Sequence, residues 1–115
     1  LMLGILGARV DQLDIHNAWQ NALLIDAYPG PKPIPSHDLI FANLKLHDNP
    51  SSGSPVFIRD SNRITLVRPI FQRNIPTNWG VTPDNVLITT IGAHDVTVQN
   101  PQSLQNGFTL LRKDK

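Results

Sequence analysis

Apolar residues recur at every second position over much of the chain after residue 36, which predicts β-strands. Between residues 38 and 46 they form one side of a half-buried strand: Ile40, Ala42, Leu44 and Leu46. Shorter apolar runs follow at residues 56–58 and 64–71, with turn residues between them. Strands spaced by about ten residues are typical of a β-sandwich.

The region around residues 85–111 predicts how these strands connect. Two β-branched runs meet at Gly92-Ala93, and Asn100-Pro101 then precedes a final apolar run at residues 107–111. This pattern favours an antiparallel hairpin with one returning strand, because no segment there is long enough for a crossover helix.

The first part of the chain has a different period. Residues 11–27 place apolar side chains at helical spacing, at Ile15, Ala18, Trp19, Ala22 and Ile25. Alternating prolines at residues 28–35 predict an extended spacer that ends this helix. We therefore expect an N-terminal apolar arm, helix and proline-rich spacer over residues 1–35, and a sandwich domain over residues 36–115. No internal repeat is evident.

The C-terminal residues resemble a known family. Asp95, Val96, Val98, Asn100 and Pro101, followed by Gly107 and Phe108, are similar to the closing strands of IPT/TIG domains, with His94 where that family favours tyrosine. The resemblance implies an Ig-like fold found in surface receptors, bacterial exterior proteins and DNA-binding factors. The expected fold is thus mainly β, an Ig-like antiparallel β-sandwich with one N-terminal helix.

Composition narrows the function classes. The net charge is +1, charged residues make up 17%, and the basic residues are scattered, which argues against a nucleic-acid partner. The absence of cysteine excludes disulfides, thiolate metal sites and a cysteine nucleophile. The apolar residues 1–8 are too few to span a bilayer. They are either the remnant of a longer hydrophobic leader or an arm that packs on a neighbouring chain.

The strongest candidates for chemistry are three His-Asp dipeptides, at His37-Asp38, His47-Asp48 and His94-Asp95. An imidazole beside a carboxylate can hold a metal or orient a general base. However, His37 and His47 would lie at opposite ends of one strand, and His16 would face solvent from the helix. The sequence therefore predicts no metal site, no cofactor and no catalytic residue.

Binding residues are expected among the aromatic and N-terminal apolar side chains. Trp19 either packs the helix on the sandwich or inserts into another subunit, and Trp79 is either a buried loop anchor or a recognition residue. The N-terminal candidates are Leu1, Leu3, Ile5 and Leu6.

These features favour a non-catalytic structural subunit of an extracellular, cell-surface or virion assembly. Its partners would be copies of itself or other subunits, contacted through the N-terminal arm and helix and the sheet edges. The alternative is a surface adhesion module that binds glycan or protein through its loops.

Overall fold

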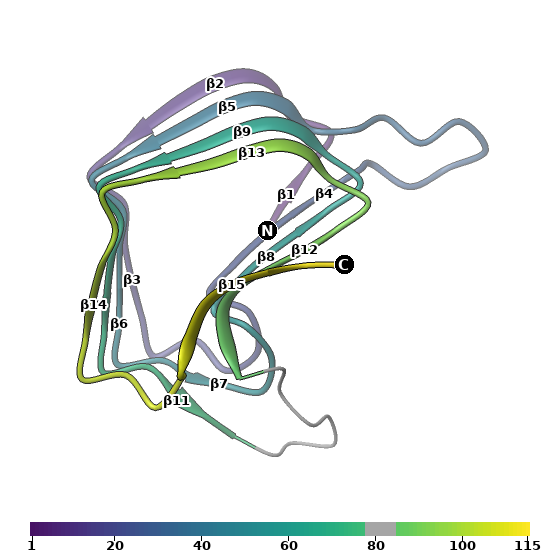
Figure 1. The fold of residues 1–115 in the computed structure, drawn as a ribbon. Coiled ribbons are helices and arrows are strands. Elements are labelled where there is room, and N and C mark those ends of the chain that lie inside the picture. Colours follow the sequence, from purple (N-terminus) through teal and green to yellow (C-terminus); the bar gives the residue numbers. More distant parts are fainter. Residues whose placement is uncertain (78–84) are drawn as a thin grey trace.

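The computed structural model describes residues 1–77 and 85–115, and the chain winds through successive turns of a parallel β-solenoid. Figure 1 looks along the solenoid axis, where three stacked faces surround a common interior. Each turn of the chain, here called a coil, contributes one strand to each face. Every strand pair in the described residues is parallel, and only the bridge between Tyr28 and Ile34 is antiparallel.

The first face is a four-stranded sheet with the order β13-β9-β5-β2. Its strands are β2 (Leu6–Asp11), β5 (His37–Ala42), β9 (Asn62–Val67) and β13 (His94–Gln99). The second face has the order β14-β10-β6-β3. Its strands are β3 (Asp14–His16), β6 (Lys45–His47), β10 (Ile70–Gln72) and β14 (Gln102–Leu104).

The third face is five-stranded, with the order β1-β4-β8-β12-β15. Its strands are β1 (Met2–Leu3), β4 (Leu23–Asp26), β8 (Val56–Arg59), β12 (Val86–Ile91) and β15 (Leu110–Asp114). The short strands β7 (Pro50–Ser51) and β11 (Ile75–Pro76) pair with each other between the second and third faces. Coil one therefore contains β2–β4, coil two β5–β8, coil three β9–β12 and coil four β13–β15.

The expected antiparallel Ig-like sandwich with an N-terminal helix is wrong, although the prediction of a mainly β chain is confirmed. The described residues contain no helix. Residues 11–27 instead turn a corner and form β3 and β4. Ile15, Leu23 and Ile25 pack in the interior of the solenoid, whereas Trp19 is exposed. A solenoid buries each coil against its neighbours, so this packing overrides the helical spacing.

The predicted hairpin at Gly92 is also wrong. β12 and β13 belong to different faces, and Gly92 has φ of +62° at the bend between them. Each strand therefore pairs with the equivalent strand of the next coil and not with its neighbour in sequence. Residues 28–35 form the loop between β4 and β5 and project from the solenoid (Figure 1). The loop does not disturb the stacking of the coils, because β5 still pairs in register with β2.

The coils repeat at irregular spacing. On the first and second faces, equivalent positions lie 31 residues apart between coils one and two, 25 between coils two and three, and 32 between coils three and four. The proline loop lengthens the first interval, and residues 77–85 lengthen the last. The sequence does contain a repeat, but its insertions conceal any fixed period.

Corners between the faces are formed by left-handed residues that stack in columns, with φ between +49° and +68°. The three columns are Gly7–Asp38–Arg63–Asp95, Gln12–Asn43–Arg68–Asn100 and Asn17–Asp48–Arg73–Gln105. Glycine, asparagine and aspartate tolerate this backbone region best. The corner at Asn43 explains why residues 38–46 are not one strand: Leu39 and Phe41 face the interior before it, and Leu44 and Leu46 after it.

An asparagine ladder runs along a neighbouring column inside the solenoid. The side chain of Asn49 donates to Asn74 Oδ1, and that of Asn74 donates to Asn106 Oδ1, each at 2.9 Å. Each amide also donates to a main-chain carbonyl of the preceding coil, on Ile15, Leu46 or Phe71. Coil one has Ala18 at this position, where its backbone N–H bonds to Asn49 Oδ1.

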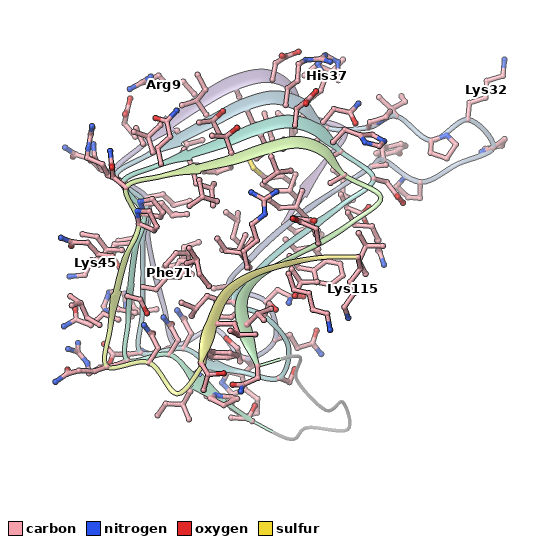
Figure 2. All side chains as sticks on the ribbon, viewed as in Figure 1. Arg9, Lys32, His37, Lys45, Phe71 and Lys115 are labelled. Carbon is pink, nitrogen blue, oxygen red and sulfur yellow. The ribbon has the colours of Figure 1, made fainter. Side chains whose placement is uncertain are left out.

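The interior is a single apolar column that includes fully buried Leu46, Phe71, Ile58 and Ile88. Figure 2 shows Phe71 pointing into the space enclosed by the three faces. In register, Phe71 stacks on Leu46 of coil two and is followed by Ser103 of coil four. Burial of this column supplies the main favourable free energy for a fold with no disulfide.

A partly buried ion pair joins β4 to β8. Arg59 Nη2 lies 2.5 Å from Asp26 Oδ2, and the Asp26 side chain is only 12% exposed. Its hydrogen bond from Arg59 lowers the pKa of Asp26 below its usual range. Because the carboxyl pKa is lower in the folded state, this ion pair stabilises the fold at pH values above the unfolded-state pKa, about 3.9. The contribution is lost as pH falls toward the folded-state pKa.

We therefore expect Asp26→Asn to reduce the free energy of unfolding at pH 7 by about 1–3 kcal/mol, because Arg59 loses a charged acceptor. The difference from the unsubstituted protein should narrow as pH falls from about 4, where Asp26 of the unfolded chain protonates, toward its lower folded-state pKa. Urea unfolding followed by circular dichroism at several pH values measures this. Asp11→Asn is the control, since Asp11 forms an exposed pair with Arg9. A difference that stays constant into acid would contradict the assignment.

Candidate functional site

A cluster of two histidines and one aspartate lies on the outer surface of the second face. Ile15 in β3 and Leu46 in β6 point into the interior of the solenoid. The residues on either side of each therefore face outward, because side chains alternate along a strand. In register, Asp14 lies beside Lys45 and His16 beside His47. Coil one therefore contributes an aspartate and a histidine, and coil two contributes a second histidine.

These three side chains converge on one carboxylate oxygen. Asp14 Oδ1 lies 2.7 Å from His47 Nε2 and 3.2 Å from His16 Nδ1. The two imidazole rings stack with centroids 5.0 Å apart. One donor atom from each of the three residues lies within 4.8 Å of the other two. The Asp14 and His16 side chains are about half exposed and that of His47 is 18% exposed, so the cluster is open to solvent.

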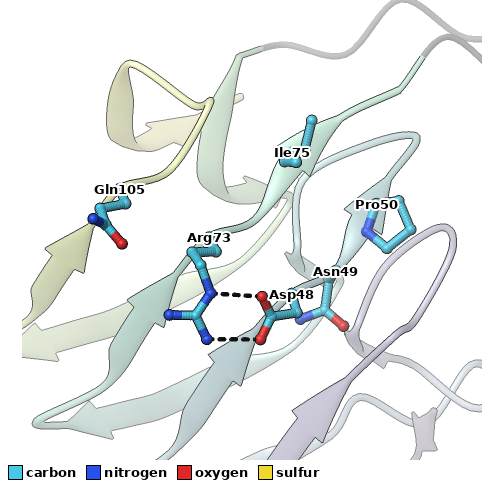
Figure 3. Close-up of a pocket in the computed structure, with 6 residues that line it drawn as sticks. All are labelled: Asp48, Asn49, Pro50, Arg73, Ile75 and Gln105. Atoms are coloured by element: carbon cyan, nitrogen blue, oxygen red, sulfur yellow. Dashed lines mark hydrogen bonds and ion pairs between the residues drawn. The ribbon is translucent and has the colours of Figure 1, made fainter.

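A chain of charged contacts fixes the orientation of His47. Its other ring nitrogen, Nδ1, lies 2.7 Å from Asp48 Oδ2. Asp48 in turn accepts two hydrogen bonds from Arg73, at 2.7 and 2.9 Å (Figure 3). Both residues sit in the corner column that borders a pocket of about 310 Å³, also lined by Asn49, Pro50, Ile75 and Gln105.

The charges in this network reinforce one another. The hydrogen bond to Asp48, followed by that to Asp14, raises the pKa of His47. Arg73 is the main cause of the lowered pKa of Asp48, and His47 is the main cause of the lowered pKa of Asp14. Both carboxyl groups are therefore ionised at neutral pH, which leaves His47 between two negative charges.

The other two His-Asp dipeptides lie apart from this cluster, at the corner between the third and first faces. Asp38 contacts His37 at 2.6 Å and Arg63 at 2.7 Å, and Arg63 is the main cause of its lowered pKa. His94 and Asp95 lie two coils further along the same column. Each dipeptide contains a corner residue, which accounts for its recurrence along the chain.

The structure distributes the predicted binding residues over coil one and the segment before it. Leu1 is 78% and Leu6 56% exposed, whereas Leu3 in β1 and Ile5 are half-buried. Trp19 is 62% exposed in the loop between β3 and β4, where its carbonyl accepts a hydrogen bond from the Ser52 N–H. Trp79 lies outside the described residues.

Sequence reasoning missed the convergence of Asp14, His16 and His47. It placed His16 on a helix, so nothing brought this histidine near residue 47. The available signal was the similarity of two short segments, Asp14-Ile-His-Asn17 and Lys45-Leu-His-Asp48, which occupy equivalent positions in successive coils. An alignment that allowed insertions between coils would have paired the two histidines.

No family model, curated protein or solved structure matches the chain. The resemblance to IPT/TIG domains therefore stays an untested prediction, although the antiparallel Ig-like sandwich that it implied is wrong. Among the described residues, none forms a helix with the length and apolar character needed to cross a bilayer.

Proposed function

We propose that this chain is a non-catalytic structural subunit that associates with a second copy of itself through coil one. The observation that carries the proposal is a chemical difference between the two ends of the solenoid. At the coil-one end, the interior side chains are apolar and only partly buried: Met2, Ile5, Ala8, Val10, Leu13 and Ile15. β2 and β3 also form the outer edges of their sheets.

At the coil-four end, charged side chains of β15 connect the third face to the first. Arg112 Nη1 donates to the carbonyl of Val96 at 2.7 Å, and so connects β15 to β13. Its Nε lies 2.9 Å from Asp114, which also accepts a hydrogen bond from Thr90. Solenoids stay soluble when terminal coils present polar groups, and Arg112 and Asp114 supply such groups at this end.

This difference favours one mode of association. Head-to-tail stacking would place Arg112 and Asp114 against the apolar side chains of coil one, and burying these charges without new partners is costly. Two coil-one ends meeting about a two-fold axis would bury apolar surface on both copies and pair their edge strands in antiparallel orientation. Such a contact closes at a dimer and does not extend into a fibre. The neutral, polar exterior agrees with a crowded extracellular or virion assembly.

The proposal predicts that lysine at the coil-one end abolishes self-association while lysine at the other end does not. Val10 and Val98 are a matched pair, because they occupy the same column, in register with Phe41 and Leu66, and both are half-buried. We expect a dimer for the unsubstituted chain and for Val98→Lys, but a monomer for Val10→Lys.

Size-exclusion chromatography with light scattering measures the outcome, and circular dichroism confirms that both variants keep the fold. A monomeric unsubstituted chain over a wide concentration range would overturn the proposal. Equal loss of association in the two variants would also overturn it, because both ends would then contribute to the contact.

A further inference from the structure

We propose that Asp14, His16 and His47 form a binding site for Zn²⁺ that links coil one to coil two. The inference does not depend on the proposed self-association, because these side chains lie on the outer surface of the second face. Two imidazoles and one carboxylate form a ligand set that divalent zinc accepts in proteins, with further positions open to water. The described residues contain no other group of three histidine or carboxylate side chains at such distances.

The distances suit a small cation. Zinc lies about 2 Å from nitrogen and oxygen ligands, so ligand atoms of a tetrahedral site are about 3.3 Å apart. Asp14 Oδ1 is already 2.7 Å from His47 Nε2 and 3.2 Å from His16 Nδ1. Small rotations of exposed side chains would open the shorter distance. The strand backbone would not need to move, because parallel pairing in register already places His16 beside His47.

The residues behind His47 complete the arrangement found around metal-binding histidines. Such a histidine usually donates its other ring N–H to a carboxylate, which fixes the tautomer and directs the free nitrogen at the metal. Here the contact between His47 Nδ1 and Asp48 leaves Nε2 facing Asp14, and Arg73 holds Asp48 with two hydrogen bonds. Asp48 is therefore a positioning residue and not a ligand.

The ligands come from two successive coils, which sets the consequence of binding. Asp14 and His16 belong to β3, at the edge of its sheet, and His47 belongs to β6. An ion bound between them would tie the edge strand of coil one to coil two. A ligand that binds only the folded state stabilises it, so zinc should raise the unfolding temperature.

The test is calorimetric titration of the metal-free full-length chain with Zn²⁺, with Mg²⁺ and Ca²⁺ as comparison ions. We expect one Zn²⁺ per chain and no binding of the other two ions, which prefer all-oxygen sites. Substitutions His16→Gln, His47→Gln and Asp14→Asn should each weaken the affinity at least tenfold. Asp48→Asn should weaken it about 10- to 100-fold without removing a ligand.

His94→Gln is the matched control, because His94 is exposed on β13, away from the cluster. It should leave zinc binding unchanged. Titration with Co²⁺ gives an independent result, since its visible absorption should appear in the unsubstituted chain and be lost in His47→Gln. Circular dichroism verifies the fold of each variant.

Two outcomes would overturn the proposal. Failure to bind one Zn²⁺ per chain would show that the three side chains form hydrogen bonds with one another and do not hold a metal ion. Binding that persists in His47→Gln at similar affinity would place the ion elsewhere on the surface. The self-association test through Val10 and Val98 is unaffected by either outcome.

Discussion

Phe71→Ala is expected to lower the free energy of unfolding by about 3–5 kcal/mol, the largest loss for any single substitution proposed for this chain. The Phe71 ring is fully buried, and it occupies the interior at the level of coil three between Leu46 and Ser103. A solenoid interior has no second layer that can move in to fill the space. Truncation therefore removes apolar burial and leaves a cavity as well.

Urea unfolding monitored by circular dichroism measures this loss. Ile70→Ala is the control, because Ile70 precedes Phe71 in β10 but is only half-buried. We expect the control to change stability by less than half as much. Equal effects of the two substitutions would show that β-propensity and not interior packing determines stability in this strand.

Asn74→Leu is expected to cost about 2–4 kcal/mol, although leucine is similar in size and more hydrophobic. The Asn74 side chain is fully buried and makes three hydrogen bonds, to the Leu46 carbonyl and to the side chains of Asn49 and Asn106. Leucine can replace none of them. It would remove a hydrogen bond from the buried Leu46 carbonyl and leave one N–H of the Asn49 amide without an acceptor, and each such loss costs about 1–3 kcal/mol.

The ladder position should also affect how the protein unfolds. Coils of a solenoid contact only their neighbours, so a lost connection between coils two and three reduces cooperativity. We expect a broader urea transition for Asn74→Leu than for Gln102→Leu, an exposed polar-to-apolar change in β14. A sharp transition with unchanged midpoint would contradict the structural role of the ladder.

Part of the fold could be predicted from the sequence. A strand at residues 56–58 was expected from the apolar run, and it is present as β8, Val56–Arg59. The prediction of one strand over residues 64–71 was wrong. A corner at Arg68 divides this segment into β9 and β10, and β9 lies between β5 and β13.

The candidate site could not be predicted, because it depends on which coil lies against which. His16 and His47 are adjacent only when β3 and β6 pair in register. That register follows from the corner residues and the asparagine ladder, and both look like ordinary turn signals in the sequence. Asn43, Asp48 and Asn49 favour a loop as much as a solenoid corner.

The sequence by itself determined that the chain is mainly β, that its strands are short, and that no disulfide holds them. Period-two alternation and frequent turn residues suffice for these conclusions, because they reflect local backbone geometry. Only the tertiary structure decided that the strands pair in parallel between coils and that two histidines and an aspartate meet. Alternation along a strand is the same in parallel and antiparallel sheets, and coil intervals of 31, 25 and 32 residues conceal the partner of each strand.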